Sequence, residues 1–207
     1  KNLSQEAALF VYPNGKCGTE GYSKYVNEEE SKQKVSIFRK VTNKSTFNFT
    51  LKDKQKFLNE LGIRIKDTNE VKLEKIAKYS IKYANVIKNI LDNPTKNTFI
   101  FTSIVKGSGA IILSLILEEI FQFNKGSDKV DKKGKRYILL TSLDENNISK
   151  YVERFNRSDN KNGEYIQVII GSDIVSEGIT FKNIQQIHIL TPFWNFSTMD
   201  QAIARGV

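Results

Sequence analysis

Short apolar runs alternate with helix-like segments through the second half of the chain. Four runs rich in β-branched and aromatic residues predict strands, at 98–102, 137–141, 165–170 and 187–190. The last two runs are nearly uninterrupted, which is typical of strands buried on both faces of a parallel sheet. Apolar positions three and four residues apart predict helices, at 71–91, 110–121 and 144–156. This alternation indicates an α/β fold with a parallel sheet flanked by helices.

The first 70 residues have a less regular pattern. The apolar run from Ala8 to Tyr12 predicts a strand, and the sequence Pro13-Asn14-Gly15 predicts a turn after it. Thr50 is placed to cap a short helix that ends before Gly62. No catalytic signature occurs here, so we expect an accessory segment.

Charge and composition narrow the class of protein. The chain has 207 residues and carries 32 Lys and Arg against 23 Asp and Glu, a net charge of +9. This excess favours a polyanionic partner such as nucleic acid, although a Lys- and Asn-rich chain is also typical of an AT-rich genome. The single cysteine, Cys17, excludes an internal disulfide and a Cys-based zinc site. Without a signal peptide or an apolar run of about 18 residues, we expect a cytoplasmic protein that is neither secreted nor bound to a membrane.

Two motifs follow the last two predicted strands. SDIVSEGITF begins at Ser172, and PFWN leads into DQAIARGV at the end of the chain. Ligands of open parallel sheets bind at the carboxyl ends of the strands, which is where both motifs start. Ser197 and Asp200 have the spacing of a capping box that opens a helix. Gln201 and Arg205, four residues apart, would share one face of that helix.

These motifs resemble the last two motifs of superfamily 2 helicases and Snf2-type translocases, T-D-x-x-x-x-G-x-[DN]-[LF] and P-x-W-N…Q-x-x-G-R-x-x-R. The likeness covers 71–207 and is greatest to helicases and transcription ATPases of large cytoplasmic DNA viruses. Three residues depart from the pattern: Ser172 replaces Thr, Thr180 replaces an acidic or amide residue, and Ala204 replaces Gly. The final Arg of the pattern would follow Val207, so we expect the chain to be part of a longer polypeptide.

The resemblance implies a RecA-like helicase C-terminal domain, truncated inside its last motif and preceded by the accessory segment 1–70. It implies that Gln201 and Arg205 are catalytic and reach the phosphates of ATP across a cleft. Gly178 and Thr180 would also contact the nucleotide, since a side chain at the glycine would collide with it. ATP and Mg²⁺ would be held mainly by an N-terminal RecA-like domain of the same polypeptide.

The resemblance also implies contacts with a single strand of DNA or RNA. The Ser172 hydroxyl would donate a hydrogen bond to a phosphate, and the loop 103–109 would offer backbone N–H groups to the same strand. Ser103, Lys106 and Gly107 are the candidates in that loop. Such contacts position the backbone and do not read sequence. Transcription machinery is a further candidate partner, and a viral factory or the virion a candidate location.

Three features have simpler interpretations. Leu143-Asp144-Glu145 mimics a metal-binding carboxylate pair, but acidic residues are ordinary in the first turn of a helix, and G-x-x-x-x-G-K-[ST] does not occur in the chain. His188, the only histidine, is expected to be a hydrogen-bonded core residue, and no metal site is expected. Trp194 is interpreted as a structural wedge in preference to a platform for a base.

A different class of function stays open at this point. The alternative is a non-catalytic nucleic-acid-binding or assembly module that keeps the fold without the chemistry. An upstream G-K-[ST] loop, a D-E-x-[HD] strand and an Arg directly after Val207 would distinguish the motor from this module.

Overall fold

The computed structural model describes residues 3–37, 40–173 and 179–192. Within these ranges the α-helices are α1 (Leu3–Leu9), α2 (Gly18–Tyr25), α3 (Lys54–Leu61), α4 (Asn69–Ala77), α5 (Ile81–Asp92), α6 (Ala110–Glu119) and α7 (Glu145–Phe155). Two short 3-10 helices are η1 (Ser142–Asp144) and η2 (Ser158–Asn160). The strands are β1 (Val26–Ile37), β2 (Lys40–Leu51), β3 (Asn97–Phe101), β4 (Asn124–Lys125), β5 (Arg136–Leu140), β6 (Val168–Gly171) and β7 (Ile184–Ile189).

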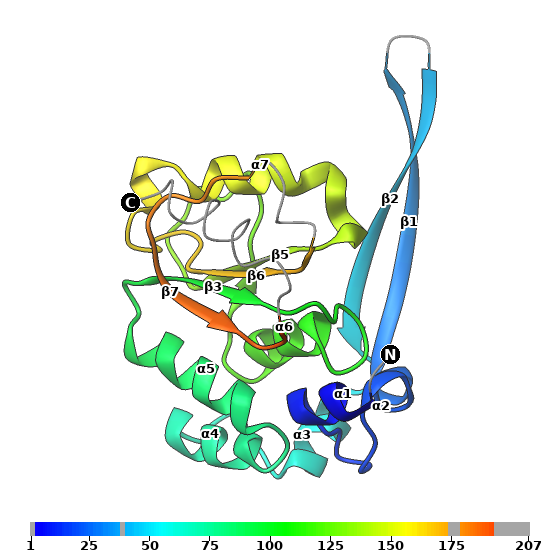
Figure 1. The fold of residues 1–207 in the computed structure, drawn as a ribbon, viewed down its shortest axis with the longest axis vertical. Helices are drawn as coiled ribbons and strands as arrows, with labels where there is room; N and C mark the ends of the chain where they lie inside the picture. The colour runs from blue at the N-terminus through cyan, green and yellow to red at the C-terminus, as the bar shows by residue number, and fades with distance from the viewer. Residues whose placement is uncertain (1–2, 38–39, 174–178, 193–207) are drawn as a thin grey trace.

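A five-stranded sheet forms the centre of the fold. Its strand order is β4-β5-β6-β3-β7, and every neighbouring pair is parallel. Helix α7 covers one face, and α5 and α6 cover the other (Figure 1). Successive β3 residues alternate between the two hydrophobic clusters, since Phe99 and Phe101 pack with α7 and Ile100 packs with α6. The expected α/β fold with a helix-flanked parallel sheet is confirmed.

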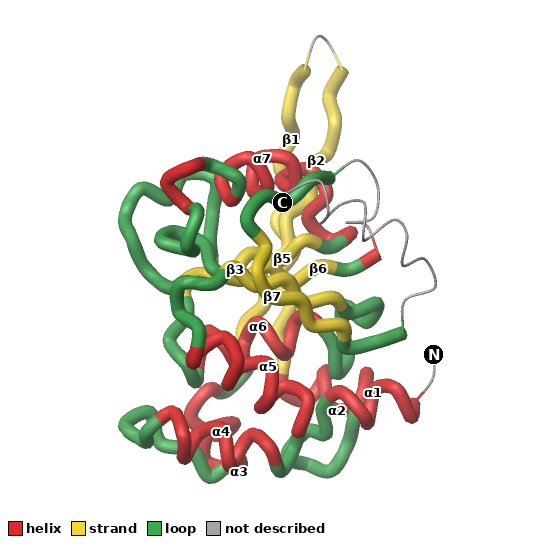
Figure 2. Tube along the Cα trace, turned by 60° about the vertical axis from the view of Figure 1, so that its left-hand side comes forward, coloured by secondary structure: helices red, strands yellow, loops and turns green. Residues whose placement is uncertain are grey.

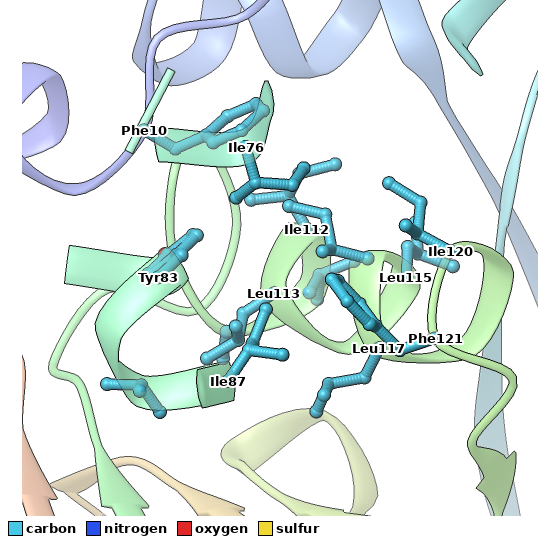
Figure 3. Packing of buried hydrophobic residues seen from close by; sticks show 14 of the residues in the cluster. Phe10, Ile76, Tyr83, Ile87, Ile112, Leu113, Leu115, Leu117, Ile120 and Phe121 are labelled. Carbon is cyan, nitrogen blue, oxygen red and sulfur yellow. The ribbon is translucent and has the colours of Figure 1, made fainter. Parts of the chain in front are cut away.

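Helix α6 is the most deeply buried of the described α-helices. Every residue from Ala110 to Leu117 is buried, as its almost continuous apolar sequence predicts. Figure 3 shows Phe10, which follows α1, and Tyr83 and Ile87, both of α5, in the same cluster as the α6 side chains. The segment before residue 71 therefore contributes to the same hydrophobic cluster as the sheet.

The prediction of one continuous helix over 71–91 is wrong. The chain forms α4 and α5, separated by Lys78, Tyr79 and Ser80. Ser80 is extended (φ −160°, ψ 103°), and its side chain accepts a hydrogen bond from Tyr83 N at 2.9 Å. A serine in this position caps a new helix, so an apolar period that runs through the break is shared by two shorter helices.

The strand predicted from Ala8 to Tyr12 is also wrong. Helix α1 ends at Leu9, and the residues after it are irregular. Phe10 and Tyr12 are fully buried side by side, with ring centroids 4.9 Å apart. The apolar run enters the helical core instead of a sheet. The predicted turn after it is confirmed, because Gly15 has φ 78° and donates its N–H to Tyr12 O.

Two predicted boundaries move for local reasons. The α3 cap is Asp53, whose side chain accepts from Lys56 N, while Thr50 lies within β2. Gly62 ends that helix with φ 71°, as predicted. Strand β6 begins at Val168, later than predicted, because the two N–H groups of Tyr165 and Ile166 bond to the Asn160 side chain.

Strand β7 is not buried on both faces, contrary to the prediction from its apolar sequence. It lies at the edge of the sheet, beside β3. Ile187 and Ile189 are 44% and 41% exposed. A short apolar run gives no information about position in the sheet order, and this one belongs to an edge strand.

Strands β1 and β2 form a separate antiparallel hairpin. Twelve residue pairs run from Val26 with Leu51 to Ile37 with Lys40. The hairpin projects well beyond the body of the molecule in two views (Figures 1 and 2). Across the described ranges, no helix is long and apolar enough to cross a lipid bilayer.

Candidate nucleic-acid interface

Five hydroxyl side chains gather where the central strands end. Thr102 and Ser103 follow β3, Thr141 follows β5, Ser172 follows β6 and Thr191 follows β7. Because the strands are parallel, these residues share one side of the sheet, which we call the carboxyl edge. Hydroxyl groups donate and accept hydrogen bonds, so the carboxyl edge has the chemistry that binds phosphate oxygens.

Ser103 is the exposed member of this group. Its N–H donates to Thr191 Oγ1 at 2.8 Å, and the two hydroxyl oxygens are 3.0 Å apart. Thr191 itself is buried. The buried threonine therefore fixes the serine at the surface.

Ser172 occupies a more enclosed position than its predicted role suggests. The residue is 5% exposed, and its backbone N–H donates to Leu140 O at 3.1 Å. This bond extends the pairing of β5 and β6 by one residue. The carboxyl edge thus brings Ser103 and Ser172 to adjacent strands, β3 and β6, but only Ser103 is exposed.

The loop 103–109 is held by a buried carboxylate that sequence reasoning missed. Glu6, in α1, is 5% exposed and accepts from Ser108 N at 2.7 Å. Gly107 has φ 66°, and a Cβ there would lie 2.7 Å from Glu6 Oε2. At Gly109 a Cβ would lie 1.8 Å from Ile104 O. Both glycines are therefore required for these close approaches, to the carboxylate at one and to the backbone at the other.

Hydrogen bonds inside the protein already use several N–H groups of this loop. Ser103 N donates to Thr191, Ser108 N donates to Glu6, and Gly109 N donates to Lys106 O at 3.2 Å. Ligand contact through these three groups would require the loop to change shape. The exposed groups of the loop are instead the side chains of Ser103 and Lys106.

Two buried tyrosines form hydrogen bonds with the backbone of the same loop. The Tyr12 hydroxyl donates to Gly107 O, and the Tyr83 hydroxyl donates to Ser108 O. Burial, and then the charge of Glu6, raise the pKa of Tyr83 above its usual value. Burial is also the main cause of the raised pKa of Tyr12. Both phenols stay protonated and continue to donate at neutral pH.

Lys106 connects the loop to the base of the hairpin. Its Nζ lies 2.8 Å from Glu28 Oε2, and Glu28 also accepts from the Tyr22 hydroxyl at 2.7 Å. Burial raises the pKa of Glu28, but the hydrogen bonds from Lys106 and Tyr22 outweigh it and hold the pKa below its usual value. The carboxylate stays ionised, so Lys106 has a fixed partner on β1.

Most of the predicted nucleotide contacts lie outside the described residues. These are Gly178, Gln201 and Arg205. Thr180 is described and is half-buried, and its carbonyl oxygen accepts from Asn156 Nδ2 at 2.7 Å. Its short neutral side chain fits one hydrogen bond to a nucleotide but cannot balance phosphate charge. In the described part of the chain, no group of three or more His, Cys, Asp or Glu side chains could hold a metal ion.

The three features with simpler interpretations have different outcomes. Asp144 stands at the N-cap of α7, and its Oδ1 accepts from Asn147 Nδ2 at 2.6 Å, which favours a structural role. His188 is half-buried, and its buried Nε2 has no hydrogen-bond partner among the described residues. The prediction of a hydrogen-bonded core histidine is therefore wrong for this atom. Trp194 lies outside the described ranges.

Sequence reasoning missed Glu6, Tyr12 and Tyr83 as residues that shape the loop. The only available signal was the paired glycines of KGSG, which indicate close backbone approach but not the identity of the approaching group. Glu6 lies 102 residues from Ser108 in the sequence. No periodic pattern relates positions so far apart.

Comparison with known proteins identifies the family. Residues 81–207 match a family model described as "Helicase conserved C-terminal domain", which is more than half of the chain. The chain belongs to this family. The parallel five-stranded sheet with its flanking helices is accordingly the RecA-like fold of a superfamily 2 helicase C-terminal domain.

Relatives of this helicase C-terminal domain include several viral proteins. A protein of Invertebrate iridescent virus 3 that is named as a helicase is 31% identical over 212 residues, covering 100% of this chain and 19% of the relative. A protein of Frog virus 3, also named as a helicase, is 40% identical over 133 residues, or 64% of this chain and 14% of the relative. Nucleoside triphosphatase I of Melanoplus sanguinipes entomopoxvirus is 28% identical over 90% of this chain and 26% of the relative. The chain thus spans about a fifth of the length of these relatives.

Proposed function

We propose that this chain is the C-terminal part of the motor of an ATP-dependent nucleic-acid helicase or translocase. The observation that carries the proposal is the family match over 81–207, which extends across the motif containing Gln201 and Arg205. The names of the relatives, helicases and a nucleoside triphosphatase, support the same activity. Viral transcription machinery is the proposed partner, and a cytoplasmic viral factory or the virion the proposed location.

The nucleic-acid contacts are proposed at the carboxyl edge. Ser103 offers an exposed side chain, and Lys106 would exchange its ion pair with Glu28 for a phosphate. Glu6, Tyr12 and Tyr83 hold the loop that carries them in place. A fixed loop loses little conformational entropy when it binds a phosphate. Ser172 would contribute from the neighbouring strand. These contacts carry no sequence information, as expected of a motor that moves along a strand.

The nucleotide contacts are proposed for Gln201 and Arg205, with Gly178 and Thr180 beside them. ATP with Mg²⁺ supplies the phosphoryl-transfer chemistry when it is bound mainly by an N-terminal RecA-like domain. Arg205 would place its planar guanidinium against phosphate oxygens that gain charge in the transition state. The side chain of Gln201 would reach the same phosphates.

The test uses the complete polypeptide and three substitutions. We expect Arg205→Ala to reduce nucleic-acid-stimulated ATP hydrolysis by about 10³-fold, the lower end of the range for an arginine finger. The motif resembles one that divides this task between two arginines, so the loss stays below the upper end. Gln201→Ala should lower turnover less. Arg205→Lys should not restore it, because an ammonium lacks the planar fork.

Melting temperature measured on the same variants separates catalysis from packing. A fall in turnover at unchanged melting temperature supports the proposal. Turnover near that of the wild type in Arg205→Ala contradicts it, as does a loss of turnover that follows a loss of stability. A complete polypeptide that binds nucleic acid but hydrolyses no ATP would instead support a non-catalytic module on the same fold.

A further inference from the structure

The β1–β2 hairpin is longer than the rest of the fold requires. Each strand has twelve residues, which corresponds to about 40 Å at 3.4 Å per residue. Its outer half stands clear of the sheet and of every labelled helix (Figures 1 and 2). A two-stranded hairpin is only marginally stable by itself, so its length is not explained by its own stability.

The base of the hairpin is fixed to the carboxyl edge. Lys106, in the loop after β3, forms the ion pair with Glu28 of β1. On β2, Phe47 and Phe49 stack with ring centroids 6.3 Å apart and line a small hollow with Leu143, which belongs to η1 after β5. The β1–β2 hairpin therefore extends from the body beside the loops proposed to bind a nucleic-acid strand. Two of the segments at the carboxyl edge contact the base of the hairpin.

Acidic and basic residues occupy different parts of the hairpin. The base of β1 carries three consecutive acidic residues, Glu28 to Glu30. Beyond them, 31–37 and 40–45 contain four lysines and no acidic residue. Across the ladder, each of these lysines is paired with an uncharged residue: Lys32 with Ser45, Lys34 with Asn43, Lys40 with Ile37 and Lys44 with Gln33. Glu30 lies 3.7 Å from Lys32, in an exposed ion pair that contributes little.

Protection of exposed strand edges does not explain this division. Charged residues on an edge prevent pairing with other chains, and either sign serves that purpose. The acidic base and the basic outer half belong to the same two strands but have opposite charge. A run of four lysines without an acidic residue favours a polyanionic ligand over a structural role.

We propose that the outer half of the β1–β2 hairpin binds the phosphodiester backbone of nucleic acid, next to the stretch bound at the carboxyl edge. The inference rests on the proposed function, because the same nucleic acid would reach both surfaces. A two-stranded β-ribbon is narrow enough to lie along a duplex or in its major groove. The same lysines could also follow a single strand, since the chemistry recognised is the phosphate in both cases.

The test compares two variants of the 207-residue chain with equal reduction of charge. The hairpin variant replaces Lys32, Lys34, Lys40 and Lys44 with Gln. The control variant replaces four exposed lysines of the body with Gln: Lys24, Lys66, Lys78 and Lys96. Binding of a fluorescein-labelled 20-base-pair duplex and of a 20-nucleotide single strand is measured by anisotropy over a salt series. A third variant with Arg at the four hairpin positions retains the charge.

We expect the hairpin variant to bind at least about tenfold more weakly than the wild type. Its salt slope on duplex should be smaller by about 0.9 for each phosphate that the hairpin no longer neutralises. The control and Arg variants should keep nearly the wild-type slope. The probe whose affinity falls further identifies the strand form that the hairpin binds. If affinity falls equally in the hairpin and control variants, the loss depends only on net charge, and the inference is wrong.

Failure of this inference and failure of the proposed function give different results. If the hairpin variant binds both probes like the wild type while Arg205→Ala abolishes hydrolysis in the complete polypeptide, the hairpin inference is wrong and the motor assignment stands. If hydrolysis is absent in the wild type but the hairpin variant still binds more weakly, the hairpin inference stands without the motor. Matching melting temperatures exclude unfolding as the cause of either result.

Discussion

At the residue scale, His188 is the position where the expected environment and the structure differ most. It lies on the edge strand β7 opposite Ile100, and desolvation lowers its pKa below the usual 6.5. The unfolded chain therefore binds a proton more readily than the folded chain between that lowered pKa and 6.5. The contribution of His188 to stability is complete above pH 6.5 and is lost as the pH falls through this window.

We expect the free energy of unfolding to fall more between pH 7.5 and pH 5 in the wild type than in His188→Gln. Urea unfolding of both proteins at the two pH values measures the difference. Glu118 acts in the opposite direction, because burial and then Glu119 raise its pKa, but both proteins contain it. An equal pH effect in the two proteins would show that the half-buried imidazole is solvated well enough to accept a proton at no cost.

At the scale of single elements, Ser80 decides where one helix ends and the next begins. Its hydroxyl donates to Leu9 O and accepts from Tyr83 N, so it caps α5 and also binds the end of α1. We expect Ser80→Ala to lower the free energy of unfolding by about 2 kcal/mol, the upper end for loss of an N-cap, because a buried carbonyl also loses its donor.

Thr68→Ala is the matched control for this change. Thr68 caps α4 by accepting from Val71 N at 3.3 Å, in an exposed position without the second bond. We expect a loss of about 0.5–1 kcal/mol there. Equal losses in urea unfolding of the two variants would show that the contact between Ser80 and α1 adds nothing.

Elements whose burial is uniform were the most accurately predicted. Helix α6 and strand β3 are apolar throughout most of their length, and each lies within two residues of its predicted range. Prediction was wrong where one pattern fits two structures. An apolar run fits a helix end in the core at Phe10 as well as a strand, and an edge strand at Ile187 as well as a central one. Only the three-dimensional neighbours distinguish these cases.

The candidate site was predictable only where a motif lies within one stretch of sequence. SDIVSEGITF indicated the family and placed Ser172 at the end of a strand, which the structure shows at β6. The burial of Ser172 and the link between Ser103 and Thr191 depend on how adjacent strands are ordered. The contact between Glu6 and Ser108 joins two distant parts of the chain, and no local pattern encodes it.

At the scale of the whole molecule, the 207 residues contain only some of the groups proposed to act on ATP. No phosphate-binding loop G-x-x-x-x-G-K-[ST] occurs in the chain, and Asp144 occupies the N-cap position of α7, where it accepts from the Asn147 side chain. We expect the isolated chain to show no ATP hydrolysis and no tight ATP binding, since the loop and its lysine hold the triphosphate. Phosphate release and titration calorimetry measure both. Turnover that Asp144→Ala abolishes would contradict this and assign the carboxylate to catalysis.

The buried carboxylate of Glu6 has a consequence for how the protein is made. The ribosome adds Glu6 to the chain 102 residues before Ser108, whose backbone N–H donates to the Glu6 carboxylate. During that interval the carboxylate lacks its partner in the loop after β3, although α2 and α5, which contact α1, have already been synthesised. The loop after β3 can take its final shape only when the earlier part of the chain packs against it, so this part of the carboxyl edge is completed only after both segments have been synthesised. A closure across so long a stretch of chain slows folding, because the entropy of bringing the two segments together is lost before their contact forms.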